Sequence, residues 1–194
     1  MVAVHPSLPI PGLTIEQLQQ IYTGTITNWN QVSGPNQLIT IFVRPVSAGH
    51  SCNIITRILG DMTISNNARF ISRSTSALSE LANTPGGIYV TAASTAVRQC
   101  SVKVLPVEQT SRQFVSPYRE PSVSAEQCSP QNHNQPNQAA FQAGQYPEEL
   151  MAELYVVVKQ DNSAARQAGE AYKNLLLTEQ GQALIEESGL VRIR

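Results

Sequence analysis

A short turn between residues 44 and 51 carries the groups best suited to chemistry. We predict that a strand ends at Arg44 and that a helix starts near Ser51, so the N–H groups of Gly49, His50 and Ser51 would point at one spot. The positive end of the helix dipole lies behind that spot. Arg44 adds a planar guanidinium that can hold phosphate or carboxylate oxygens with two parallel hydrogen bonds. The pattern predicts an anion-binding site without a catalytic step.

Two groups of residues allow an enzymatic interpretation. His50, Ser51 and Cys52 place a base beside two nucleophiles, and three glutamates lie within residues 148–153. Neighbours in sequence rarely face one point, and the chain has no Gly-x-Ser-x-Gly, Walker A or HExxH motif. We therefore expect no catalytic residues.

Metal and cofactor sites are not expected either. The spacings of Cys52, Cys100 and Cys128 match no zinc or CxxC motif. His5 and His133 have no partner ligands nearby in sequence. We interpret His5 as a surface or hinge residue and His133 as part of a polar loop.

Composition is that of one soluble domain. The 194 residues are 41% hydrophobic, and 13 Lys and Arg oppose 14 Asp and Glu for a net charge of −1. This balance gives no field for a polyanion, so no nucleic acid partner is expected. The longest apolar runs are far shorter than the roughly 20 residues that span a bilayer. The first residues do not form a signal peptide.

Periodicity predicts an α/β sandwich with a largely parallel sheet, because strands and helices alternate along most of the chain. Residues 107–148 are rich in Pro, Gln, Asn and Ser, and we interpret them as a long surface loop. Trp29 is expected to pack in the core with Ile26. The predicted strands lie near 2–4, 39–44, 68–71, 87–91, 102–106 and 154–159, and the predicted helices near 14–23, 51–59, 74–83 and 163–188 with a break at Thr178.

The segment from Leu13 to Trp29 provides the strongest family signal. Thr14 and Gln17 form a predicted capping box, and Gly24 ends the helix. The string Leu-Thr-x-x-Gln-Leu-x-x-Ile-Tyr-Thr-Gly-Thr-Ile-Thr-Asn-Trp resembles the entry to the second lobe of the phosphate-binding proteins of ABC transporters. Further segments are similar to that family in the same order, namely residues 2–6, 87–90, 154–159, 171–182 and 189–191.

The resemblance implies a fold and a division of the chain. It implies a three-layer lobe of the type 2 periplasmic-binding-protein fold, as a single domain over residues 1–194. The second lobe would take 6–153, the hinge strands 2–5 and 154–159, and a C-terminal helical segment 163–188. Most of the first lobe and the signal peptide would then lie outside this chain.

The family turn reads Arg-x-Asp-x-Ser-Gly-Thr, and its Arg, Ser, Gly and Thr contact phosphate. Arg44, Gly49 and the nearby Ser51 hydroxyl remain, but Val46, Ala48 and His50 occupy the Asp, Ser and Thr places. Each lost hydrogen bond to a charged ligand is worth roughly 1.5 to 3 kcal/mol, so phosphate should bind at least a few hundredfold more weakly. Protonated His50 would restore part of this at low pH.

A second departure precedes the predicted return strand. The family usually has Tyr-Pro-x-Thr-Arg-x-Leu there, whereas this chain has three glutamates between Tyr146 and Leu154. We expect this acidic stretch to disfavour an anion nearby.

The periplasmic resemblance also bears on the cysteines. Cys100 and Cys128 bracket the Pro- and Gln-rich segment, so in an oxidising compartment we expect them to pair and Cys52 to stay free. Three unconnected thiols in a cytosolic protein are the alternative.

The functional prediction is periplasmic or extracellular binding of inorganic phosphate or a similar oxyanion for ABC-type uptake, with an ABC permease as a partner. The alternative is a domain of the same fold with a degenerate ligand site that acts as a sensory or protein-interaction module.

Overall fold

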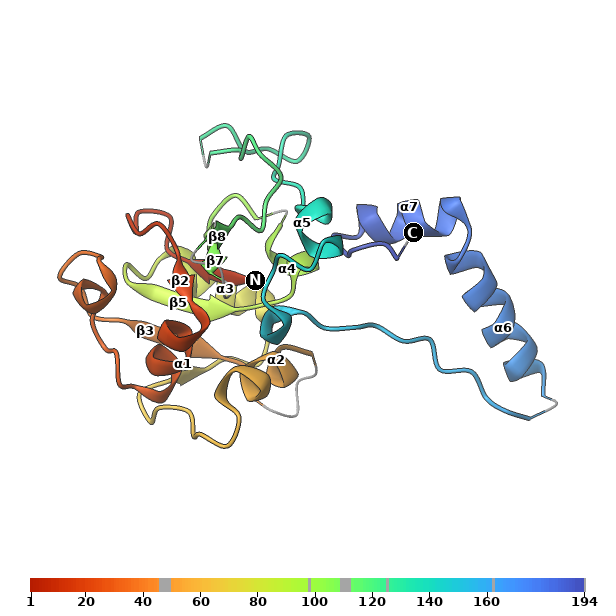
Figure 1. Ribbon diagram of the computed structural model, residues 1–194, viewed down its shortest axis with the longest axis horizontal. Helices are drawn as coiled ribbons and strands as arrows, with labels where there is room; N and C mark the ends of the chain where they lie inside the picture. The colour runs from red at the N-terminus through yellow and green to blue at the C-terminus, as the bar shows by residue number, and fades with distance from the viewer. Residues whose placement is uncertain (46–49, 98, 109–112, 125, 162, 194) are drawn as a thin grey trace.

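The computed structural model of the chain divides into a compact body and a projecting C-terminal arm (Figure 1). We call residues 1–151 the body and residues 152–188 the arm. For residues 50–53 only the backbone is described. The structure describes residues 1–45, 50–97, 99–108, 113–124, 126–161 and 163–193.

The body is built on a five-stranded mixed sheet in the order β4-β3-β5-β1-β6. Strand β3 runs parallel to both β4 and β5, while β1 runs antiparallel to β5 and β6. The prediction of a largely parallel sheet was therefore incomplete, because the first strand of the chain enters the middle of the sheet in the opposite direction. The strands are β1 Val2–Val4, β3 Thr40–Val43, β4 Arg69–Phe70, β5 Gly87–Val90 and β6 Lys103–Leu105.

Helices cover both faces of this sheet. Alternate strand residues such as Ile41 and Ile88 face the larger core together with helices α1 (Ile15–Thr23) and α2 (His50–Leu59). Their neighbours Phe42 and Tyr89 face the smaller core with α3 (Ser74–Ala82). The strand period of two therefore sends side chains into two separate cores.

Local signals set the ends of α1 as the sequence indicated. Thr14 Oγ1 accepts a hydrogen bond from the Gln17 N–H, and the Gln17 side chain accepts one from the Thr14 N–H. Gly24 ends the helix in the left-handed conformation, with φ of 86°. The 3-10 helix η1 (Trp29–Val32) follows, and the buried Trp29 indole donates to the Gly86 carbonyl at 2.9 Å. Its predicted place in the core is confirmed.

The region predicted as one long loop, 107–148, contains regular structure that the sequence analysis missed. A small sheet in the order β2-β7-β8 joins Leu13–Thr14, Val107–Glu108 and Phe114–Val115. Helix α5 (Gln138–Gln142) closes the region. Three of its aromatic residues, Tyr118, Phe141 and Tyr146, are buried, and the last two rings meet edge-on at 4.8 Å. These few aromatic anchors supply the core contacts that the polar composition concealed.

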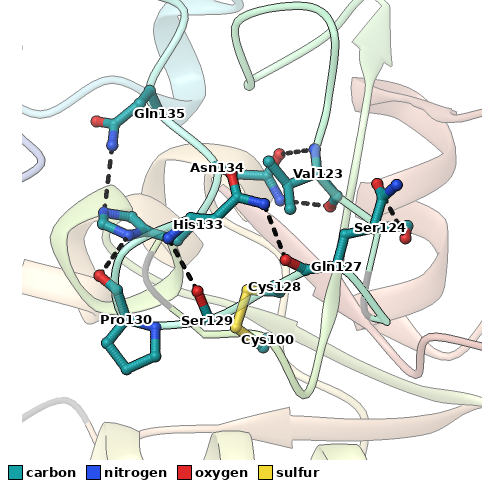
Figure 2. Close-up of a disulfide and its surroundings, with 11 residues drawn as sticks. Cys100, Val123, Ser124, Gln127, Cys128, Ser129, Pro130, His133, Asn134 and Gln135 are labelled. Atoms are coloured by element: carbon teal, nitrogen blue, oxygen red, sulfur yellow. Dashed lines mark hydrogen bonds between the residues drawn. A yellow bond between two sulfur atoms is a disulfide. The ribbon is translucent and has the colours of Figure 1, made fainter.

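Between β8 and α5 the chain is irregular but tied in several places (Figure 2). The expected disulfide between Cys100 and Cys128 is present, with 5.4 Å between the Cα atoms. Nearby, Asn134 both accepts from the Val123 N–H at 2.7 Å and donates to the Val123 carbonyl at 3.0 Å. The side chain of Cys52 lies outside the described part of the chain.

The predicted strand at 154–159 is the clearest error. These residues form no strand, and Tyr155 and Val157 are 76% and 91% exposed. A strand requires a hydrogen-bonded neighbour, and none of the described strands pairs with this segment. The predicted C-terminal helices are present as α6 (Ala164–Leu176) and α7 (Glu179–Glu187), and Thr178 caps α7 as expected.

Both ends of the arm are fixed to the body. At its start, Leu150 is buried in the short 3-10 helix η3 (Glu148–Leu150), and the Arg57 guanidinium of α2 donates to the carbonyls of Glu148 and Met151. At its end, Gln138 of α5 donates to the Leu190 carbonyl at 2.8 Å. The chain therefore leaves the body at the start of the arm and returns to contact it after α7.

Candidate functional site

The carboxyl ends of β3 and β4 bring polar groups to one edge of the main sheet. Arg44 follows β3 directly, and the two strands are parallel. Ser74 begins α3, the helix after β4. In open α/β sheets ligands bind outside the carboxyl ends of parallel strands. The predicted anion-binding residue Arg44 therefore lies at the edge where a ligand is expected.

The Arg44 side chain is half-buried and makes a defined contact. Its Nη1 donates to the Ser74 Oγ at 3.2 Å. The Tyr89 hydroxyl, from the neighbouring strand β5, donates to the same oxygen at 3.1 Å. The sequence analysis missed Ser74 and Tyr89. A serine at the first position of a helix after a parallel strand was the available signal for Ser74.

Helix α2 begins at His50, close to the predicted start. The backbone of His50 and Ser51 therefore forms the first turn of the helix, whose N–H groups have no partner within the helix. No acidic residue lies in that first turn, so the positive end of the dipole is not offset there. The side chains of His50 and Ser51, and all of Gly49, Val46 and Ala48, lie outside the described residues.

The buried face of α2 explains its place over the sheet. The apolar side chains that pack α2 against the sheet recur at helical spacing, so they lie on one face of the helix. This packing holds the N-terminus of α2 near the end of β3. The buried residues of this face are Ile54, Ile55, Ile58 and Leu59.

The acidic stretch begins beside the last turn of α2. Arg57, in the last turn of α2, holds the carbonyl of Glu148. The seven residues from His50 to Arg57 correspond to about 10 Å along the helix. The expectation that this acidic stretch disfavours an anion nearby stays a prediction, because the side chains of the anion-binding turn lie outside the described residues.

The histidines outside the turn have local partners. His5 Nδ1 lies 2.8 Å from the Ser7 Oγ, and His133 Nδ1 lies 3.1 Å from the Pro130 carbonyl (Figure 2). In the described part of the chain, no group of three or more His, Cys, Asp or Glu side chains could hold a metal ion. Of the helices described, none has both the length and the apolar character of a membrane span.

Burial changes the acidity of two amines in the body. The Met1 amine is buried, donates to the Thr91 carbonyl at 2.8 Å, and has its pKa lowered to about 5 by desolvation. Lys103 Nζ donates to the carbonyls of Leu8 and Ile10, and desolvation lowers its pKa as well. These amines hold chain segments together within the fold.

A mixed sheet with helices on both faces, and polar groups at its carboxyl edge, is the architecture of an open α/β domain. The chain belongs to the PBP superfamily, because residues 1–180 match the PBP superfamily domain. This is a family of binding proteins and not of enzymes.

Solved structures share the fold. An ABC-type phosphate transport receptor from Vibrio cholerae superposes with a TM-score of 0.66 and 19% identity, covering 98% of this chain and 67% of the receptor. PstS from Borrelia burgdorferi gives 0.63 and 19%, covering 100% of this chain and 68% of PstS. A high affinity periplasmic phosphate-binding protein, PfluDING, gives 0.58 and 14%, over 99% of this chain and 68% of that protein.

One curated relative is similar in sequence. The phosphate-binding protein PstS of Bacillus subtilis (strain 168) is 38% identical over 47 residues. The matched segment is 24% of this chain and 16% of the Bacillus protein.

Proposed function

We propose that this domain captures phosphate or a similar oxyanion at the turn between β3 and α2. Arg44, Gly49, His50 and Ser51 would form this domain's share of the site. The observation that carries the proposal is the half-buried Arg44 guanidinium at the carboxyl end of β3, six residues before the start of a helix whose first turn contains no acid. The phosphate-binding proteins of the same fold support the choice of ligand.

We further propose that the chain acts as the second lobe of a type 2 periplasmic-binding-protein fold. Residues 6–153 would form the lobe, 2–5 and 154–159 the two segments at the hinge, and 163–188 the C-terminal helical segment. The exposed apolar side chains of 154–158 support this division, because a strand there would gain a partner from another lobe. In that assembly the anion would be shared by two lobes.

The cellular role follows from this proposal. The domain would act outside the cytoplasm, in the periplasm or extracellularly, and would deliver its ligand to an ABC permease. The Cys100–Cys128 disulfide supports an oxidising compartment. The periplasmic phosphate-binding protein among the similar structures supports the same location.

Calorimetric titration with phosphate at low ionic strength tests the site. We expect weak binding that R44A abolishes, because the guanidinium supplies the charge-assisted hydrogen bonds. R119A is the matched control, since Arg119 is an exposed arginine on the disulfide-tied loop. Equal binding by wild type and R44A would contradict the proposal.

A triple variant sharpens the same test. V46D, A48S and H50T together would restore the orienting carboxylate and two hydroxyls. We expect the affinity for phosphate to rise by about a few hundredfold, from hydrogen bonds of roughly 1.5 to 3 kcal/mol each.

A second candidate is a sensory or protein-interaction module with a degenerate ligand site. It is favoured by the arm, where α6 has no buried residue and large apolar side chains such as Tyr172 and Leu175 are half-exposed. If neither the wild type nor the triple variant gives a phosphate signal, this second candidate becomes the better one.

A further inference from the structure

Ser74 is a shared acceptor between two side chains from different strands. Arg44 Nη1 donates to its Oγ at 3.2 Å, and the Tyr89 hydroxyl donates to the same atom at 3.1 Å. A serine hydroxyl oxygen has two acceptor lone pairs, so these two donors occupy both. The Arg44 guanidinium is thus held at a defined atom.

Packing in the body fixes the positions of both Tyr89 and Ser74. Tyr89 is 1% exposed, and it lies opposite Ala3 of β1 and Phe42 of β3 in the sheet. Ser74 is the first residue of α3, a helix anchored by the buried Leu78 and Leu81. Ser74 and Tyr89 are already held in position by their own packing. Holding the long Arg44 side chain against them therefore costs less conformational entropy.

We propose that Ser74, backed by Tyr89, is the positioning residue that aims Arg44 at the anion. This inference rests on the proposed oxyanion function, and it names the residues on which the strength of the site depends. The turn has Val46 where the family resemblance puts an orienting carboxylate. An orienting contact comes from α3 through Ser74, which Tyr89 of β5 backs. A guanidinium whose orientation is fixed before binding loses less conformational entropy when it binds an oxyanion.

The first experiment measures the orientation of Arg44 without any ligand. Phenylglyoxal modification of Arg44, followed by peptide mass spectrometry, is compared with that of the exposed Arg119 in the same sample. We expect S74A and Y89F to speed the modification of Arg44 severalfold and to leave Arg119 unchanged. S74T keeps the hydroxyl and should behave as the wild type does. Equal rates for Arg44 in all four proteins would overturn the proposal.

The second experiment measures phosphate affinity by calorimetry. S74A should weaken binding by about tenfold and Y89F by about threefold, since each removes one link of the chain that orients Arg44. S74T should retain the wild-type affinity. Thermal unfolding of each variant shows whether the body remains folded.

A double-mutant comparison separates positioning from direct contact. In an R44K background the planar fork is absent, so S74A should have almost no further effect on affinity. A full tenfold effect in that background would overturn the positioning role, because Ser74 would then contact the anion itself. If the wild type binds no oxyanion, the proposed function fails, while the labelling rates still decide whether Ser74 and Tyr89 orient Arg44.

Discussion

The body and the arm form their secondary structure by different means. In the body, strands and helices share two buried cores, and central residues such as Leu18 and Ile88 are fully buried. In the arm, α6 buries no residue, yet it forms thirteen residues of helix behind the Ser163 cap. The segment 154–159, rich in β-branched residues, forms no strand. Helical hydrogen bonds are satisfied within one segment, whereas a strand depends on a second one.

The same difference explains what the sequence could predict. The caps at Thr14 and Thr178 and the glycine at Gly24 are local, and helix ends were predicted to within a few residues. The direction of β1 and the pairing of β7 with β2 depend on segments about a hundred residues apart, so no local pattern could reveal them.

The residues of the candidate site also divide into those that local sequence indicates and those that distant strand pairing brings in. Arg44 and the start of α2 are neighbours in sequence, and the strand-turn-helix pattern indicated both. Ser74 and Tyr89 reach Arg44 from 30 and 45 residues away along the chain, through the pairing of β3 with β4 and β5. Contacts of that kind follow from sheet order, which the sequence alone does not state.

The largest contrast between the two regions should appear on truncating a leucine in each. Leu18→Ala in α1 removes a fully buried side chain and should lower the free energy of unfolding by roughly 3 to 5 kcal/mol. Leu184→Ala in α7 removes a side chain that is 51% exposed and should cost less than about 0.5 kcal/mol. Urea unfolding followed by the fluorescence of Trp29 measures both. Equal losses would mean that the arm belongs to the cooperative core.

The pH dependence of stability should come mainly from the body. The Met1 amine has a pKa of about 5 when folded against an ordinary value of 8.0, so the unfolded chain binds more protons between these values. Stability should therefore rise from pH 5 to pH 8 by about 4 kcal/mol, since lowering this pKa from 8.0 to about 5 costs the folded state about that much. Acetylation of the amine removes the titrating group and should flatten this slope. An unchanged slope after acetylation would assign the dependence to other groups.

The disulfide should stabilise the body by an intermediate amount. C100S with C128S opens a loop with a sequence separation of 28, which costs about 3 to 4 kcal/mol in the chain-entropy model. Alkylation of the denatured wild-type protein from an oxidising compartment should label one thiol, that of Cys52. Three labelled thiols would contradict the pairing in the folded protein and weaken the proposed location.

The smallest effect should come from a proline in the arm. Val157→Pro removes a backbone N–H that pairs with no described strand, at a side chain that is 91% exposed. We therefore expect a change in the free energy of unfolding within about 0.5 kcal/mol. Val90→Pro in β5 is the matched control, because it removes an N–H that the buried Tyr22 hydroxyl accepts at 3.0 Å and places a ring in the core. Urea unfolding at several protein concentrations measures both variants.

A loss well above 1 kcal/mol for Val157→Pro would show that residues 154–158 pair as a strand in solution. If that loss grew with protein concentration, the partner would be a second copy of this chain, and the arm would then owe its structure to contacts between molecules.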